Sequence, residues 1–90
     1  MKTFKHILKL IEEQNLTTAE LQLTSIGEIE LPAAEQHYLW GLLFVKRSDW
    51  KQAQTHFLHA VALDPQSPAR ETLEMLTNIY DYHYKDNLNP

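Results

Sequence analysis

An internal repeat with a period of about 34 residues is the feature that most constrains the fold of this chain. When the sequence is shifted by that period, without a gap, apolar or small residues fall on one another: Leu8 on Leu42, Leu16 on Trp50, Ala19 on Ala53, and Leu23 on Phe57. Repeats of this length are typical of folds in which one supersecondary unit stacks on the next. We therefore expect two copies of one unit and a shorter remainder within the 90 residues.

Each unit has the pattern of a helix pair. Only two glycines and four prolines interrupt the chain, no segment alternates in the way of a half-buried strand, and apolar residues recur at helical spacing. We predict five helices, at residues 2–14, 17 to between 27 and 29, 33–47, 50–63 and 68–86. Because the connections between them are short, neighbouring helices are expected to run antiparallel, which gives an all-α fold.

Local signals mark three of the helix starts. Asp49 precedes the fourth helix and is a good acceptor for its free amide groups. Thr17 and Glu20 have the spacing of a capping box, in which each side chain satisfies a free amide of the other residue. Pro68 suits the first turn of the fifth helix, where proline sacrifices no helical hydrogen bond.

The stretch LWGLLFVKRSDWKQAQTHFLHAVALDP, residues 39–65, has small, aromatic and proline residues at set intervals: Gly41, Phe44, Trp50, Ala53, Phe57, Ala60 and Pro65. This pattern resembles the tetratricopeptide repeat (TPR) family. The resemblance implies a single domain over residues 1–90, with a degenerate repeat at 1–33, a clear repeat at 34–67, a capping helix at 68–86 and a tail at 87–90. It also implies TPR-like antiparallel helix hairpins that form a short right-handed α-solenoid.

Gly41 lies in the middle of the predicted third helix, although glycine costs about 1 kcal/mol relative to alanine there. A residue without a side chain allows the third and fourth helices to approach closely. Trp40 and Phe44 are then expected to fill the space on either side of the contact. In the first repeat Ile7 replaces this small residue and Ile26 replaces the alanine, so residues 1–33 match the pattern less well.

The sequence allows two registers for the packing of the last helix. In strict register with the repeat its core positions would be Glu71, Glu74 and Asn78, whereas a shift of one residue brings in Met75, Leu76 and Ile79. Its charged residues predict a solvated face, which suits a cap on the repeats: Arg70, Glu71, Glu74, Asp81 and Lys85. Whether Tyr80, Tyr82 and Tyr84 are packed or exposed is also open.

Composition excludes several classes of function. The net charge of −4 provides no basic surface for phosphates, so we expect no nucleic acid partner. The absence of cysteine excludes disulfides and thiolate chemistry. The longest apolar run, Leu39 to Val45, is far shorter than the roughly 20 residues that span a bilayer. A soluble cytoplasmic protein without membrane insertion is the expectation.

No set of side chains with the pattern of an active site appears. The carboxylates do not converge, the two glycines form no phosphate loop, and the serines lie in no nucleophile motif. His56 and His59 have a spacing that can place two imidazoles on one helix face, but no third ligand follows. We therefore expect no enzymatic activity, cofactor, metal or small-molecule substrate.

The family resemblance implies a concave groove that binds a protein or peptide, lined here by Phe4, Leu8, Ile11, Glu35, Tyr38, Leu42 and Val45. The third helix is apolar nearly all round, which indicates that it is covered on two sides. The basic residues with which some TPR proteins hold an acidic C-terminus are missing from these positions. A groove for a hydrophobic or amphipathic segment of a partner protein is the first hypothesis, and a homodimer through the same surface is the alternative.

Overall fold

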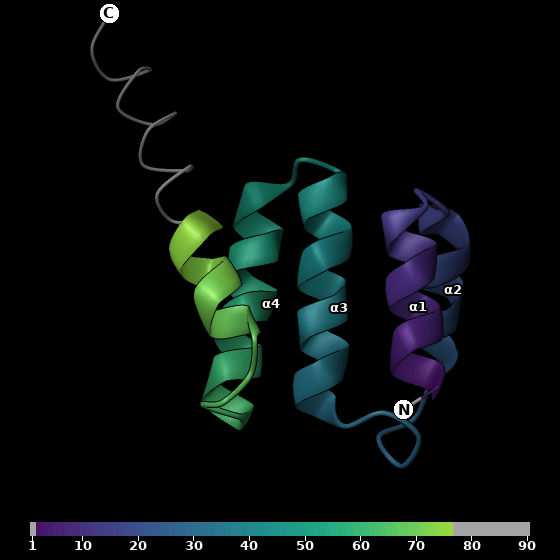
Figure 1. Cartoon of the computed structure of the whole chain (residues 1–90), viewed down its shortest axis with the longest axis horizontal. Coiled ribbons are helices and arrows are strands. Elements are labelled where there is room, and N and C mark those ends of the chain that lie inside the picture. Colours follow the sequence, from purple (N-terminus) through teal and green to yellow (C-terminus); the bar gives the residue numbers. More distant parts are fainter. Residues whose placement is uncertain (1, 77–90) are drawn as a thin grey trace, which may run out of the picture.

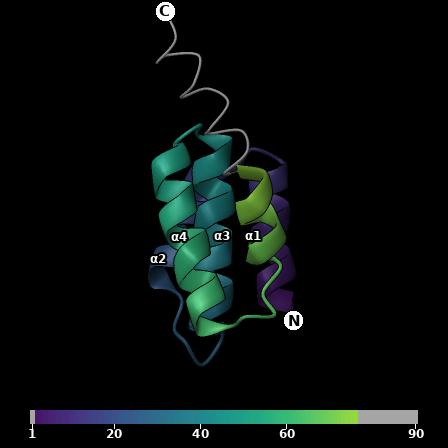
Figure 2. The same ribbon diagram turned by 90° about the vertical axis from the view of Figure 1, so that its left-hand side faces the viewer.

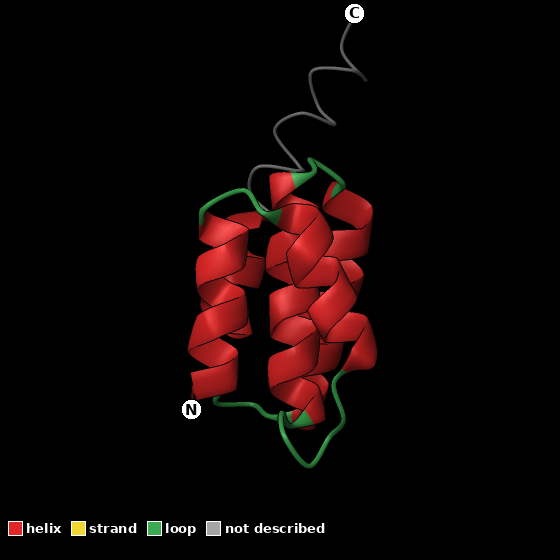
Figure 3. Ribbon diagram, turned by 90° about the vertical axis from the view of Figure 1, so that its right-hand side faces the viewer, coloured by secondary structure: helices red, strands yellow, loops and turns green. Residues whose placement is uncertain are grey.

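The chain forms two helix hairpins, α1 (Lys2–Glu12) with α2 (Leu16–Ser25) and α3 (Ala33–Lys46) with α4 (Trp50–Leu63). These elements are seen in a computed structural model that describes residues 2–76. Residues 69–76 are also helical, and residues 2–76 contain no strand (Figure 3). The all-α prediction is confirmed. The rest of the predicted fifth helix, the three tyrosines and the tail lie outside the described residues.

Successive helices run in opposite directions, so each hairpin is antiparallel (Figure 1). α3 is the central helix: it contacts α1 and α2 on one side, and among these four helices its contact with α4 is the most extensive. The helical residues 69–76 lie against the second hairpin (Figure 2), where Ala69 and Leu76 share a core cluster with Phe57 of α4. The central position of α3 accounts for its nearly all-round apolar character.

The helix bounds of the second hairpin agree with the prediction. α4 begins and ends at the predicted residues, and α3 ends one residue early, at Lys46. The side chain of Asp49 accepts a hydrogen bond from the backbone N–H of Gln52, at 3.2 Å, so the predicted cap is confirmed. α4 then ends two residues before Pro65, which cannot continue a helix.

The capping box predicted at Thr17 is wrong. α2 begins at Leu16, with Asn15 as its N-cap, so Thr17 already lies within the helix. The hairpin turn determines this start, because the N–H of Asn15 is bonded to the carbonyl of Leu10 at 2.8 Å. That bond fixes where the chain leaves α1 and therefore where α2 can begin.

Both hairpins close with the same backbone turn. In the first, Gln14 adopts a left-handed conformation (φ 67°), and Gln14 and Asn15 donate to carbonyls of the last turn of α1. In the second, Ser48 has φ 59° and makes the corresponding bond to Val45, while Asp49 bonds to Phe44. This is the Schellman pattern of helix termination. Gln14 and Ser48 are separated by one period of the sequence repeat.

A Ser48→Gly variant is expected to stabilise the fold by about 0.5–1 kcal/mol. A left-handed conformation costs a residue with a side chain roughly 1–2 kcal/mol, and the greater freedom of glycine in the unfolded chain offsets part of the gain. Urea denaturation would measure the change. Lys9→Gly, on an exposed position within α1, is the control and should destabilise by about 1 kcal/mol. Equal destabilisation by both variants would contradict the role of the turn.

Two clusters of buried side chains form the core. The first joins the two hairpins: Ile7, Ile11, Ala19, Leu23, Leu31, Leu39 and Leu43. The second joins α4 to residues 69–76: Ala53, Phe57, Ala60, Ala69 and Leu76. Leu42 of α3 packs against both clusters and so links them.

Gly41 is buried where α3 meets α4. A Cβ atom at this position would lie 2.6 Å from Cδ1 and 2.8 Å from Cζ of the Phe57 ring, distances that atoms do not adopt in contact. Phe57 has no exposed surface and is held within the second core cluster. The prediction that Gly41 permits close approach of the two helices is confirmed.

The last helix follows neither predicted register completely. Leu76 is buried, as the shifted register requires, but Met75 is 65% exposed. Glu71 and Glu74 are exposed rather than in the core, and Ile79 lies outside the described residues. Buried Ala69 and Leu76 are about two helical turns apart and so share one face. The predicted solvated face holds for Arg70, Glu71 and Glu74, all exposed.

Candidate functional site

Five half-buried apolar side chains connect α1 to α3, and we call them the α1–α3 strip: Phe4, Leu8, Tyr38, Leu42 and Val45. The rings of Phe4 and Tyr38 stack across the two helices, with centroids 6.1 Å apart and an interplanar angle of 9°. Tyr38 also contacts the ring of Phe57, at 6.0 Å between centroids. Each of these side chains packs on the core and keeps part of its surface accessible.

Helical spacing explains why these side chains share a surface. Phe4 and Leu8 are one turn apart on α1, and Tyr38, Leu42 and Val45 follow at steps of four and three residues on α3. Glu35 precedes Tyr38 by three residues and occupies the same face. From Glu35 to Val45 the surface extends about 15 Å along α3, at the helical rise of 1.5 Å per residue.

Ile11 does not belong to this surface, although it was predicted to line the groove. It is 1% exposed and lies in the first core cluster with Leu39 and Leu43. α1 ends one residue later, at Glu12, and approaches the central helix closely enough to bury this position. The apolar surface on α1 is therefore limited to its first two turns.

The residues predicted to pack the repeat differ in how deeply they are buried. Gly41, Ala53, Phe57 and Ala60 are buried, whereas Trp40, Phe44 and Trp50 are half-buried and Pro65 is exposed. Trp40 and Phe44 stack on each other, with ring centroids 6.0 Å apart, and both stack on His56 of α4. Their part in holding the α3–α4 hairpin together thus involves a histidine that the sequence pattern does not single out for packing.

A cluster of three histidines lies at the same hairpin. The ring of His37 of α3 is tilted by 31° against the ring of His56, with centroids 5.2 Å apart, and stacks on the ring of His59, with centroids 5.0 Å apart. His56 and His59 both belong to α4. The Nδ1 atoms of His37 and His56 are 3.0 Å apart and share a hydrogen bond, so one ring donates and the other accepts. His37 is 19 residues from His56, and helical spacing within one helix cannot reveal such a contact.

Burial lowers the pKa of both His37 and His56 below the ordinary histidine value. The positive charge that His59 can carry lowers the pKa of His37 further, and His37 and His59 together lower that of His56. The lowered pKa of each ring favours its neutral form, and the shared hydrogen bond requires that at least one of the two Nδ1 atoms is unprotonated. Within the described part of the chain, no group of three or more potential ligands is arranged to hold a metal ion.

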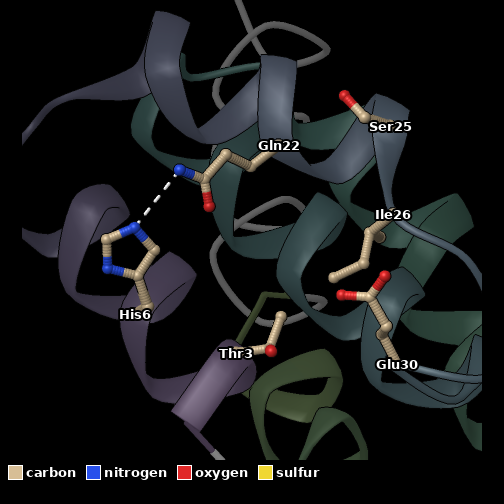
Figure 4. A pocket seen from close by; sticks show the side chains of 6 residues that line it. All are labelled: Thr3, His6, Gln22, Ser25, Ile26 and Glu30. Carbon is tan, nitrogen blue, oxygen red and sulfur yellow. Dashed lines mark hydrogen bonds between the residues drawn. The ribbon is translucent and has the colours of Figure 1, made fainter.

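A separate hollow of about 500 Å³ opens on the first hairpin (Figure 4). It is lined by Thr3, His6, Gln22, Ser25, Ile26 and Glu30. His6 and Gln22 face each other across it, with 3.2 Å between Nε2 atoms. The Ser25 hydroxyl donates to the Leu21 carbonyl, as is common for helical serine.

The fold and these contacts define an all-α protein of stacked helix hairpins. It is similar to the solution NMR structure of protein BF1650 from Bacteroides fragilis, with a TM-score of 0.82 and 30% sequence identity. The alignment covers 99% of this chain and 91% of the Bacteroides chain, so the two proteins belong to the same family. No family model and no curated protein sequence matches the chain. Within residues 2–76, none of the helices has the length and apolar character needed to cross a membrane.

Proposed function

We propose that this chain is a non-enzymatic, TPR-like protein-interaction module that binds a hydrophobic or amphipathic segment of a partner protein on the α1–α3 strip. The repeat interpretation is supported by the two hairpin turns, which have the same hydrogen bonds one repeat period apart. It is also supported by the buried alanines Ala19 and Ala53, which occupy equivalent places in α2 and α4. A short right-handed α-solenoid in the cytoplasm is the form we propose.

The observation that carries the binding function is the apolar α1–α3 strip itself. Its members come from two different helices, and the stacked rings of Phe4 and Tyr38 make it continuous. Contiguous exposed apolar patches larger than a few hundred Å² usually mark interaction sites. Its length along α3, about 15 Å, corresponds to about three turns of a helix. An amphipathic helix that inserts a few apolar side chains is the segment best suited to it.

Site-specific cross-linking tests this proposal. We expect a photoreactive residue at Tyr38 to cross-link a discrete partner protein in cells, and the same residue at Leu21 to cross-link none. Leu21 is also apolar and is 64% exposed, but it lies on α2 outside the strip. A second change, Leu8→Lys, should abolish the Tyr38 adduct while circular dichroism shows that the helices are retained. Because Leu8 packs on the first core cluster, this variant should also have a lower melting temperature than the parent.

Two results would change the conclusion. An adduct between two copies of this chain, together with a dimer in solution, would favour the self-association alternative. Equal cross-linking from Tyr38 and Leu21, or an adduct that survives Leu8→Lys, would exclude the strip as the binding surface.

A further inference from the structure

Two exposed lysines of α1 lie beside the α1–α3 strip. Lys5 is three residues before Leu8 and is therefore its neighbour on the helix surface, and Lys9 follows Lys5 by one turn. In the repeat these lysines are equivalent to Leu39 and Leu43 of α3, which are buried against the first hairpin. On α1 the same direction leads away from α3. Lys5 and Lys9 therefore line the edge of the strip that is farthest from α3.

Lys46 of α3 adds a third positive charge at one end of the strip. It follows Leu42 by one turn and is exposed. Among residues 2–76, none of these three lysines forms an ion pair with a carboxylate, and the ion pair found there joins Arg47 to Glu20. Within the described chain, the charges of the three lysines are thus not neutralised by direct pairing.

Two carboxylates also belong to this surface, and they lie at its opposite ends. Glu12 is the last residue of α1, whereas Glu35 is the third residue of α3, and the two helices run in the same direction (Figure 1). The Oε2 atom of Glu35 is closed to solvent, so this oxygen cannot meet a charged group of a bound segment. Between the two ends, the charged residues along the edge of the strip are Lys5 and Lys9.

The net charge of −4 counts little at this edge of the molecule. At physiological ionic strength the Debye length is about 8 Å, so more distant exposed charges are largely screened. Lys5 and Lys9 are about 6 Å apart along the axis of α1, at the helical rise of 1.5 Å per residue, and therefore act together within this range. A segment that lies along α1 meets a positively charged edge.

Building on the proposed function, we infer that the bound segment is an amphipathic helix with two acidic residues, one turn apart, on one flank of its apolar face. The apolar face packs on the strip, and the two carboxylates pair with Lys5 and Lys9, which have the same spacing on α1. Exposed ion pairs contribute little affinity, so the strip provides most of the binding energy. The lysines determine specificity, because they favour an acidic flank and disfavour a basic one.

A displayed library of amphipathic helical peptides tests this inference. Each peptide has about 20 residues, long enough to form a helix, with a fixed apolar face and random residues on both flanks. Selection on the wild-type protein should enrich aspartate or glutamate at two positions one turn apart on the same flank. An enriched peptide should bind Lys5→Glu/Lys9→Glu about tenfold more weakly than wild type, because two attractive pairs are replaced by two repulsive ones.

A second double variant controls for net charge. Lys51→Glu/Arg70→Glu changes the charge by the same amount at exposed positions on α4 and the last helix, outside the strip, so it should bind the peptide as wild type does. Replacing the two acidic residues of the peptide by lysine should weaken binding to wild type. The same replacement should restore binding to Lys5→Glu/Lys9→Glu, as expected for direct pairs.

Cross-linking of the peptide separates this inference from the proposed function. A photoreactive residue at Tyr38 should capture the enriched peptide, and the same residue at Leu21 should not. If the peptide is captured at Tyr38 but no acidic pair is enriched, or the two double variants bind it equally well, the acidic character of the segment is refuted and the strip remains the site. If no selected peptide is captured at Tyr38, the proposed function itself fails.

Discussion

A Gly41→Ile variant is expected to lose about 3 kcal/mol of folding free energy, although isoleucine forms helices better than glycine. The reason is the Phe57 ring, which lies where the new Cβ and its branches would be placed. Phe57 is fully buried in the second core cluster and cannot move aside without displacing its neighbours. For a domain of this size, the loss corresponds to a fall in melting temperature of roughly 12–24 °C. Thermal denaturation followed by circular dichroism would measure it.

The first hairpin suggests a compensating change. At the positions equivalent to Gly41 and Phe57 it has Ile7 and Leu23, both buried in the first core cluster. Adding Phe57→Leu to Gly41→Ile should therefore recover at least about 1 kcal/mol, a coupling that a double-mutant cycle detects. Gly27→Ala is the control, because a Cβ there meets no atom within 4 Å. A Gly41→Ile variant as stable as Gly27→Ala would contradict the close contact of α3 and α4.

The helices could be predicted from the sequence because their signals are local. The bounds of α4 follow from the capping aspartate before it and the proline after it. The repeat period predicts where the second hairpin turn occurs once the first is known, and the two turns have that separation. The start of α2 was predicted wrongly because the turn competes with the local capping signal. A hydrogen bond to Leu10, on the preceding helix, decided the outcome.

The candidate site was less predictable, because burial depends on residues that are distant in the sequence. Ile11 fits the apolar face of α1, yet the neighbouring helices cover it completely. His37 joins His56 only after α3 and α4 fold together. Spacing identifies the face of a helix, and tertiary contacts decide what that face does.

The histidine cluster predicts that acid destabilises the fold through the α3–α4 hairpin. His37 and His56 have a lowered pKa in the folded state, whereas in the unfolded chain both return to about 6.5. Above that pH the rings are neutral in both the folded and the unfolded state, so the titration of His37 and His56 does not make the stability depend on pH. As the pH falls below about 6.5, the unfolded chain binds protons that the folded chain does not, and stability decreases. We expect the melting temperature to be several degrees lower at about pH 5.2 than at about pH 7.5.

The double variant His37→Phe/His56→Phe should remove most of this pH dependence. Phenylalanine keeps an aromatic ring against Trp40 and Phe44 but cannot bind a proton. His6→Gln is the matched control, since His6 is exposed on α1 and bonds only Gln22 among the described residues, so it should retain the wild-type dependence. Measurements kept above about pH 5 avoid most of the carboxylate titration, which centres near pH 4. If the double variant lost as much stability as wild type between the two pH values, protonation of this cluster could not be the cause.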